Sequence, residues 1–144
     1  MAPAASGGAA IAQGLAAFES SADCAVGAGA RARTPALPDL SISAVTIGEI
    51  QAGIELTREQ DEPKAAELEQ WLGLVAASFN ALPMDAAAFR TWARLMHRAS
   101  DTLYEDAMIA ATAKVHQLTV VTRNVTDFKR FGVALLNPFV AARK

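Results

Sequence analysis

The sequence predicts an α/β fold in three layers, with helices on both faces of a mostly parallel sheet. Strand-like and helix-like segments alternate through residues 40–137, an order typical of a parallel sheet with crossover helices. The segment Leu118–Thr122 contains β-branched residues and no polar alternation, as expected for a strand buried on both faces. The segment Ala107–Val115 is apolar on nearly every face, so a helix here must be covered on all sides.

The first 38 residues differ in composition from the rest of the chain. They are rich in Ala, Gly, Ser, Arg and Pro and show little periodicity, which is typical of a linker or a disordered segment. We therefore predict that residues 1–38 are an atypical segment, disordered or unrelated to the domain, and that residues 39–140 form the folded domain.

The segment Leu40–Val45 alternates apolar and polar residues and is predicted to be a strand. Thr46 follows as a candidate N-cap of the next helix, and Glu49 stands three residues later, the spacing of a capping box. On the residues alone, this purely structural role is the simpler interpretation of Glu49. A role in a functional site remains the alternative.

The rest of the chain continues the alternation of elements. Pro63 falls in the first turn of a helix predicted over Glu59–Phe79, where proline is tolerated. Asp85 is placed to cap the following helix, and Ser100–Thr102 to cap the apolar central one. The remaining predicted elements are an extended piece at Asn80–Pro83, the strand Leu118–Thr122, a helical turn at Val125–Phe131, a stop at Gly132 and a strand at Val133–Leu136.

Length and composition limit the possible classes of protein. A chain of 144 residues that is 52% hydrophobic and 19% charged is expected to form one globular domain. Its net charge of −2 gives no overall basic field for a nucleic acid, although basic residues dominate Ala113–Lys144, where Asp127 is the only acid. That basic stretch suits a polyanionic substrate, or is simply a solvated surface.

The compartment is predicted to be the cytoplasm. The single cysteine, Cys24, excludes an internal disulfide and fits a reducing environment. No apolar run reaches the roughly 18–20 residues of a membrane-spanning helix, and the first residues lack the positive start of a signal peptide.

Polar residues gather at the ends of the buried elements and suggest a metal site. The candidates are Glu49, Asp106, Asn124 and Asp127, with Glu105 in reserve. They offer only oxygen ligands, so the expected metal is Mg²⁺, with Mn²⁺ as an alternative. Such an ion activates water and stabilises the charge that develops on a phosphodiester. The competing interpretation is that acids at helix starts merely complement the helix dipole.

Several motifs resemble those of one known family. SISAVTIGEIQAGIE, DAMIAATAKVHQLTVVTRN, TDF and LLNPF, within residues 40–139, are similar to the successive motifs of PIN-domain ribonucleases. Within these, the chain resembles the VapC-type toxins of bacterial toxin–antitoxin pairs, in the FitB-like branch. The resemblance implies a PIN-like fold and a Mg²⁺-dependent endoribonuclease that acts on RNA, is inhibited by a small antitoxin protein and forms a homodimer.

The resemblance also assigns roles to residues. Glu49 matches the second acidic residue of the site, and Asp106 matches the third, a direct metal ligand. Asn124 and Asp127 match the fourth, variable polar position and its neighbour, with Thr122 expected to orient them. The implied metal ligands are Asp106, Glu49 and Asp127. A metal-dependent phosphatase or DNA nuclease is a further alternative, because nothing in the sequence separates RNA from DNA as substrate.

The chain departs from the family at its start. Family members open with a strand that ends in an aspartate, in a pattern like LLDTN, and that aspartate is a principal metal ligand. The corresponding region here, GAAIAQG at residues 8–14, contains no aspartate and no strand pattern. We therefore expect the N-terminal strand to be absent and the chain to be impaired in activity and stability. The alternative function is a catalytically inactive PIN-like module that binds an antitoxin or an intact homologue.

Overall fold

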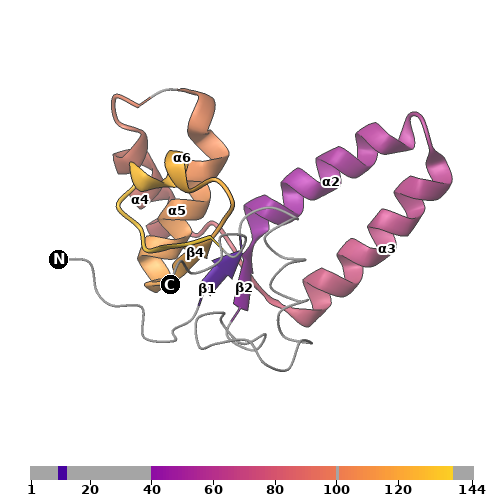
Figure 1. Cartoon of the computed structure of the whole chain (residues 1–144), viewed down its shortest axis with the longest axis horizontal. Coiled ribbons are helices and arrows are strands. Elements are labelled where there is room, and N and C mark those ends of the chain that lie inside the picture. The colour runs from indigo at the N-terminus through magenta and orange to yellow at the C-terminus, as the bar shows by residue number, and fades with distance from the viewer. Residues whose placement is uncertain (1–9, 13–39, 100, 138–144) are drawn as a thin grey trace, which may run out of the picture.

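The computed structural model of the chain describes residues 10–12, 40–99 and 101–137. Within these residues the protein has a parallel five-stranded sheet with the strand order β3-β2-β1-β4-β5 (Figure 1). The strands are β1 (Ala10–Ala12), β2 (Leu40–Ser43), β3 (Asn80–Leu82), β4 (Thr119–Val121) and β5 (Leu135–Leu136). The helices are α2 (Ala44–Arg58), α3 (Glu62–Ser78), α4 (Ala86–Met96), α5 (Tyr104–His116) and α6 (Val125–Lys129), and a 3-10 turn, η2, spans Asp101–Leu103.

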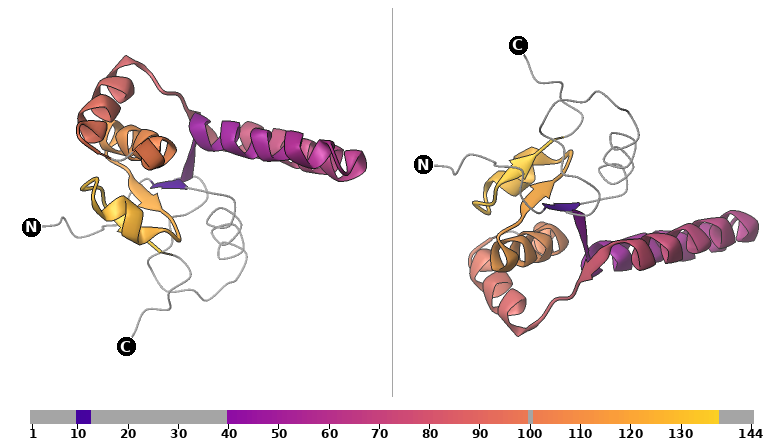
Figure 2. Two further views of the ribbon diagram at one scale, coloured as in Figure 1. Left: turned by 90° about the horizontal axis from the view of Figure 1, so that it is seen from above. Right: turned by 90° about the horizontal axis from the view of Figure 1, so that it is seen from below.

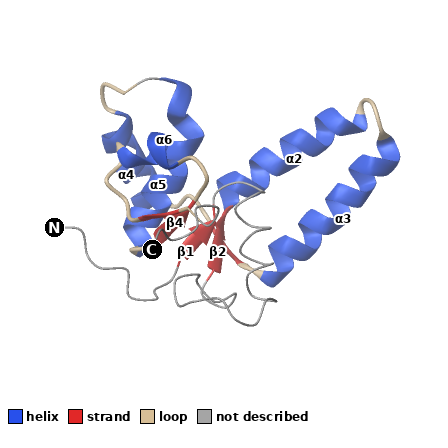
Figure 3. Cartoon of the chain, in the orientation of Figure 1, coloured by secondary structure: helices blue, strands red, loops and turns tan. Residues whose placement is uncertain are grey.

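Apolar clusters lie on both faces of the sheet, so the predicted three-layer α/β/α architecture is confirmed. Ile11 and Val120 point to the face covered by α4 and α5, where Ile109 and Phe128 complete the cluster. The opposite face carries a second cluster, composed of Ala10, Leu40, Ile42, Val75 and Val121. Figure 3 shows the helices arranged around the strands.

The N-terminal strand is present, so the prediction of its absence is wrong. β1 is the central strand: it pairs in parallel with β2, where Ala10 lies opposite Leu40, and with β4, where Ile11 lies opposite Val120. The sequence hides this strand because small apolar residues carry no alternation, and a short strand with partners on both edges is stabilised by its neighbours rather than by its own propensity. The neighbouring strands are therefore paired, and the expected loss of stability has no basis. The rest of residues 1–38 lies outside the described residues.

The junction between β2 and α2 also differs from the prediction. The strand ends at Ser43 rather than at Val45, and the Ser43 hydroxyl caps α2 by accepting a hydrogen bond from the backbone N–H of Val45 at 3.1 Å. Thr46 therefore lies inside the first turn of the helix. The predicted capping box of Thr46 and Glu49 does not form, which removes the purely structural interpretation of Glu49.

Helices α2 and α3 form a hairpin that projects from the body of the molecule (Figures 1 and 2). Arg58, at the end of α2, joins the two helices through ion pairs with Glu62 at 2.9 Å and Glu69 at 2.6 Å of α3, and it also pairs with Glu55 of its own helix at 3.2 Å. A small cluster of Ile54, Ala65 and Leu72 fills the space between them. As predicted, Pro63 falls in the first turn of α3. Asp61 caps this helix.

Helix α5 is the most buried helix of the described structure. Ala107, Ile109, Ala110, Ala111 and Ala113 are all inaccessible to solvent, which confirms that the central helix is covered on all sides. The turn η2 precedes the helix, and its N-cap position, Leu103, makes no side-chain hydrogen bond; Ser100, part of the predicted cap, lies outside the described residues.

Other local signals of the sequence are confirmed. Asp85 caps α4 by accepting a hydrogen bond from the N–H of Ala88 at 2.9 Å. Gly132 adopts a positive φ of 67° after α6, a conformation that glycine adopts without strain. No helix in the described ranges is long and apolar enough to cross a membrane.

The position of β1 generates a test on stability. Ile11 is 0% exposed, so we expect Ile11→Ala to lower the free energy of unfolding by about 2–5 kcal/mol through lost burial and a residual cavity. The exposed Leu56, at 66%, provides the control, and Leu56→Ala should change stability by less than about 0.5 kcal/mol. Urea denaturation measures both. Equal stability of the two variants would show that β1 is not part of the core.

Candidate functional site

The predicted site residues lie at the carboxyl edge of the central strands. β2 leads through Ser43 into α2, which carries Glu49 in its second turn. β4 leads through Thr122 and Asn124 into α6, which carries Asp127. Because the strands are parallel, these two connections leave the same edge of the sheet, the usual position of ligand sites in open α/β folds.

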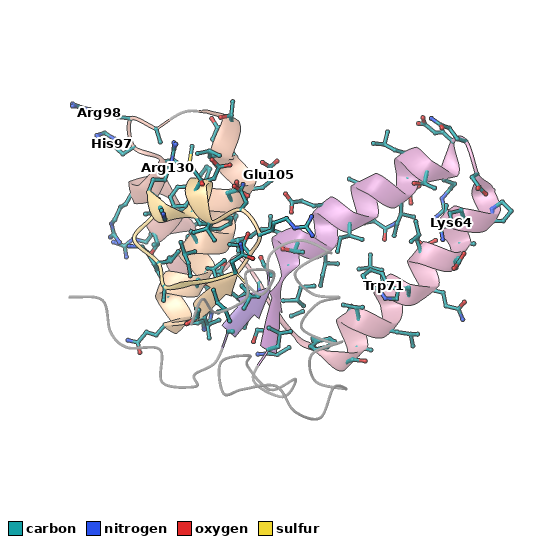
Figure 4. All side chains as sticks on the ribbon, in the orientation of Figure 1. Lys64, Trp71, His97, Arg98, Glu105 and Arg130 are labelled. Atoms are coloured by element: carbon teal, nitrogen blue, oxygen red, sulfur yellow. The ribbon has the colours of Figure 1, made fainter. Side chains whose placement is uncertain are left out.

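Helix α5 brings the third part of the site from above this edge. Glu105 and Asp106 occupy its first turn, and Figure 4 shows Glu105 on the side of α5 that faces α2. The start of α5 is fixed against α4, because the Trp92 Nε1–H donates a hydrogen bond to the Tyr104 carbonyl at 3.3 Å and the two rings pack at 5.9 Å between centroids. The acids of α5 therefore stand on a rigid support.

The carboxyl groups of the site influence one another's charge. Desolvation raises the pKa of Asp106 above its ordinary value, and the negative charges of Asp127 and Glu105 raise it further. Desolvation is also the main cause that raises the pKa of Glu49, followed by the charges of Glu105 and Asp106. Although Glu49 is exposed over the residue as a whole, the charges of Glu105 and Asp106 act on its carboxyl. The structure thus brings together the acids that the sequence placed at separate element ends.

Asn124 and Asp127 form one local unit. The Asn124 side-chain amide donates from Nδ2 to Asp127 Oδ2 at 2.6 Å, and the backbone N–H of Asn124 donates to Thr122 Oγ1 at 2.9 Å. Thr122 itself is fully buried. The hydrogen bonds agree with the predicted orienting role of Thr122, and they show that Asn124 acts on Asp127 in this arrangement.

Thr46, to which the sequence assigned a capping role, has a different environment in the structure. Thr46 is 1% exposed, and its Oγ1 is the only buried side-chain N or O atom in the described part of the chain that lacks a hydrogen-bond partner. An unpaired buried hydroxyl costs about 1–3 kcal/mol. The sequence does place Thr46 three residues before Glu49, and this spacing puts both side chains on one face of a helix.

The donor set fits a divalent cation by its chemistry. The side chains that meet here offer carboxylate, amide and hydroxyl oxygens, the ligands that Mg²⁺ and Mn²⁺ take. Desolvated carboxyls that repel one another are also costly without a compensating charge. Among the described side chains, no three acidic, histidine or cysteine groups are close enough together to hold one ion. This geometry suits an ion that keeps most of its water and uses one or two carboxylates.

The raised pKa values predict how stability depends on pH. The folded state binds more protons than the unfolded state between the ordinary and the raised pKa values of Glu49 and Asp106, so these groups destabilise the fold above that range and cease to do so as pH falls through it. We expect Asp106→Asn to stabilise the metal-free protein at pH 7 by up to about 1 kcal/mol, since solvent screens this partly exposed group.

Urea denaturation in chelator at pH 7 and at about pH 4, close to the ordinary Asp pKa of 3.8, measures this effect. The stability difference between Asp106→Asn and the unmodified chain should shrink at the lower pH. Glu59→Gln, which removes an exposed carboxyl at the end of α2, is the control and should retain the original pH dependence. A variant less stable than the unmodified chain at pH 7 would show that Asp106 is stabilised, not strained, in the folded state.

Comparison with known proteins agrees with this fold. The chain matches the PIN domain family over residues 15–134. Toxin FitB of Neisseria gonorrhoeae is 32% identical over 109 residues, a match that covers 72% of this chain and 78% of the relative. VapC ribonuclease Y4jK of Sinorhizobium fredii is 32% identical over 114 residues, covering 72% and 77%.

A solved structure shows the same likeness. The crystal structure of FitAcB from Neisseria gonorrhoeae superimposes with a TM-score of 0.64 at 32% identity, and the match covers 72% of this chain and 78% of the other. The family match, the two relatives and the shared fold agree with one another. The chain belongs to the PIN-domain family and, within it, to the VapC-type toxins of the FitB-like branch.

Proposed function

We propose that the chain is a metal-dependent endoribonuclease that acts as the toxin of a toxin–antitoxin pair, with Mg²⁺ as its cofactor and Mn²⁺ as a substitute. The observation that carries this proposal is a chain of carboxyls at the carboxyl edge of a parallel sheet, in which the charge of Asp106 acts on Glu49 and the charge of Asp127 acts on Asp106. The names of two relatives, a toxin and a ribonuclease, support the choice of reaction.

The residues of the chain have distinct tasks in this proposal. Asp106, Glu49 and Asp127 would hold the cation, directly or through its bound water, and the cation would supply an activated water and neutralise charge on the phosphodiester. Asn124 keeps the Asp127 carboxylate in place through its hydrogen bond, and Thr122 fixes the backbone of Asn124. The buried body of α5 prevents Asp106 from moving away from the other acids.

The proposed partners follow from the same family membership. The substrate is RNA, a small cognate antitoxin protein inhibits the chain, and two copies form a homodimer. The α2–α3 hairpin offers apolar surface for a protein partner, since Leu56 and Leu74 are exposed on it. The cytoplasm remains the predicted location.

A second candidate function rests on one specific observation. The residue joined to Ala12, the last residue of β1, is Gln13, at the point of the sequence where the family resemblance implies an aspartate. Glutamine carries no charge and is a weaker ligand for a hard cation than a carboxylate. The alternative is therefore a catalytically inactive PIN-like module that binds an antitoxin or an intact homologue.

Cleavage of RNA tests the leading proposal. We expect cleavage in Mg²⁺, none in excess chelator, and a loss of at least about 100-fold for Asp106→Ala, because even changes outside the ligand shell cost 10–100-fold. Gel analysis of a mixed RNA substrate measures the rates, and Glu59→Gln serves as the unaffected control. Cleavage that persists in chelator or without Asp106 would exclude the metal mechanism.

Position 13 separates the two candidate functions. We expect Gln13→Asp to tighten Mn²⁺ binding by about 10-fold or more by supplying a further carboxylate, and to raise the rate of RNA cleavage. Gln13→Asn is the matched control, with the shape of aspartate and no charge. Isothermal titration calorimetry and the cleavage assay give both readouts.

The outcomes of this comparison are distinct. If the unmodified chain cleaves no RNA and the Gln13→Asp variant does, the result supports the catalytically inactive module. Purification of the unmodified chain together with an antitoxin would strengthen that conclusion. A chain already active, and unchanged by Gln13→Asp, would show that the first carboxylate is dispensable here.

A further inference from the structure

Thr46 is an exception among the buried hydroxyls of this fold. Ser43 accepts a hydrogen bond from Val45, and Thr122 accepts one from Asn124. Thr112 donates to the Met108 carbonyl at 3.0 Å. Thr46 is buried as deeply as these residues, yet its Oγ1 has no partner within the described structure.

The position of Thr46 at the start of α2 explains why its hydroxyl does not form the hydrogen bond that is usual for a threonine within a helix. A threonine within a helix commonly bonds to the carbonyl four residues earlier, as Thr57 does with Gly53 at 3.0 Å and Thr112 with Met108. For Thr46 that residue is Ile42, which belongs to β2, because α2 begins only at Ala44. The carbonyl of Ile42 points along the sheet, where β2 has partner strands on both edges.

The same position places the hydroxyl at the acidic site. Thr46 lies on α2 one turn before Glu49, and residues three apart in a helix share a face. Helix α2 packs against α5, and the charges of Glu105 and Asp106 on α5 act on Glu49. Thr46 also follows the end of β2 by only three residues, so it stands at the carboxyl edge of the sheet.

We infer that Thr46 is a positioning residue of the site, whose hydroxyl forms its hydrogen bond with an oxygen atom that enters when the site is filled. The oxygen belongs either to the hydration shell of the cation or to the phosphodiester of RNA. A hydroxyl both donates and accepts, so it serves either source. The inference rests on the proposed function, because it requires a cation or an RNA substrate at Glu49 and Asp106.

A purely structural role makes a different prediction. If the hydroxyl only fills space, valine at this position would retain the shape and remove an unsatisfied group, with no effect on ligands. If the hydroxyl serves the filled site, the same substitution changes stability and ligand binding in opposite directions, although most damaging substitutions lower both. Stability rises while ligand binding weakens.

The experiment compares Thr46→Val and Thr46→Ser with the unmodified chain. In chelator we expect Thr46→Val to melt roughly 2–8 °C higher, from the relief of an unpaired buried group. Its Mn²⁺ affinity, measured by titration calorimetry without RNA, should fall by about 10–100-fold, as for other groups outside the ligand shell. Thr46→Ser keeps the hydroxyl and should bind Mn²⁺ within about 3-fold of the unmodified chain.

The RNA arm distinguishes the two sources of the oxygen. An unchanged Mn²⁺ affinity with a raised KM for RNA assigns the hydroxyl to the phosphodiester, whereas weaker Mn²⁺ binding assigns it to the hydration shell. Normal Mn²⁺ binding together with a normal KM overturns the inference. A lower melting temperature of Thr46→Val in chelator also overturns it, because the hydroxyl would then have a partner within the fold.

A benchmark variant separates failure of this inference from failure of the proposed function. If Asp106→Asn abolishes Mn²⁺ binding while Thr46→Val leaves binding and KM unchanged, the metal site stands and the role of Thr46 is wrong. If the unmodified chain binds no Mn²⁺ and cleaves no RNA, both are wrong.

Discussion

The repulsion between carboxyl groups on immobile supports is the constraint on which the site depends. Asp106 stands on a helix whose next residues are buried against the sheet, so its backbone is held near Asp127 and Glu105, whose charges act on it. Glu49 stands on a second helix whose start is fixed by the Ser43 cap. Side chains on flexible loops would separate and regain their hydration. Here the fold holds them together, and the remaining ways to lower the electrostatic cost are a proton or a bound cation.

β1 determines how far apart the two halves of the site lie. The strand order shows that β2 and β4 do not pair with each other, and that β1 joins them. One half of the site, with Glu49, follows β2, and the other half, with Asp127, follows β4. The spacing between them is thus two strand separations, about 9–10 Å across the sheet edge. Side chains from the two halves must bridge this gap above β1.

The success of sequence reasoning depended on whether a signal was local. Asp85 and Pro63 were placed correctly because a cap or a first-turn proline acts within a few residues. β1 was missed because its stability comes from strands more than twenty residues away in the chain. The choice between Ser43 and Thr46 as helix cap was not decidable from residue type, since both carry hydroxyls, and it was fixed by where the sheet ends. The acids were identified by type and position, but their hydrogen bonds and the unpaired Thr46 hydroxyl required the fold.

The same electrostatics explain why the number of carboxyls in such a site has opposite effects on stability and on metal binding. Each added carboxylate strengthens the attraction for a cation, and each raises the pKa of its neighbours and destabilises the metal-free fold. This chain retains the strand that organises the site, since β1 spans Ala10–Ala12. The next residue in the sequence is Gln13, which is uncharged. The chain therefore requires less compensation when no metal is bound. In this protein the framework of the site and its full charge are separable, because the framework comes from strand pairing and the charge from single side chains.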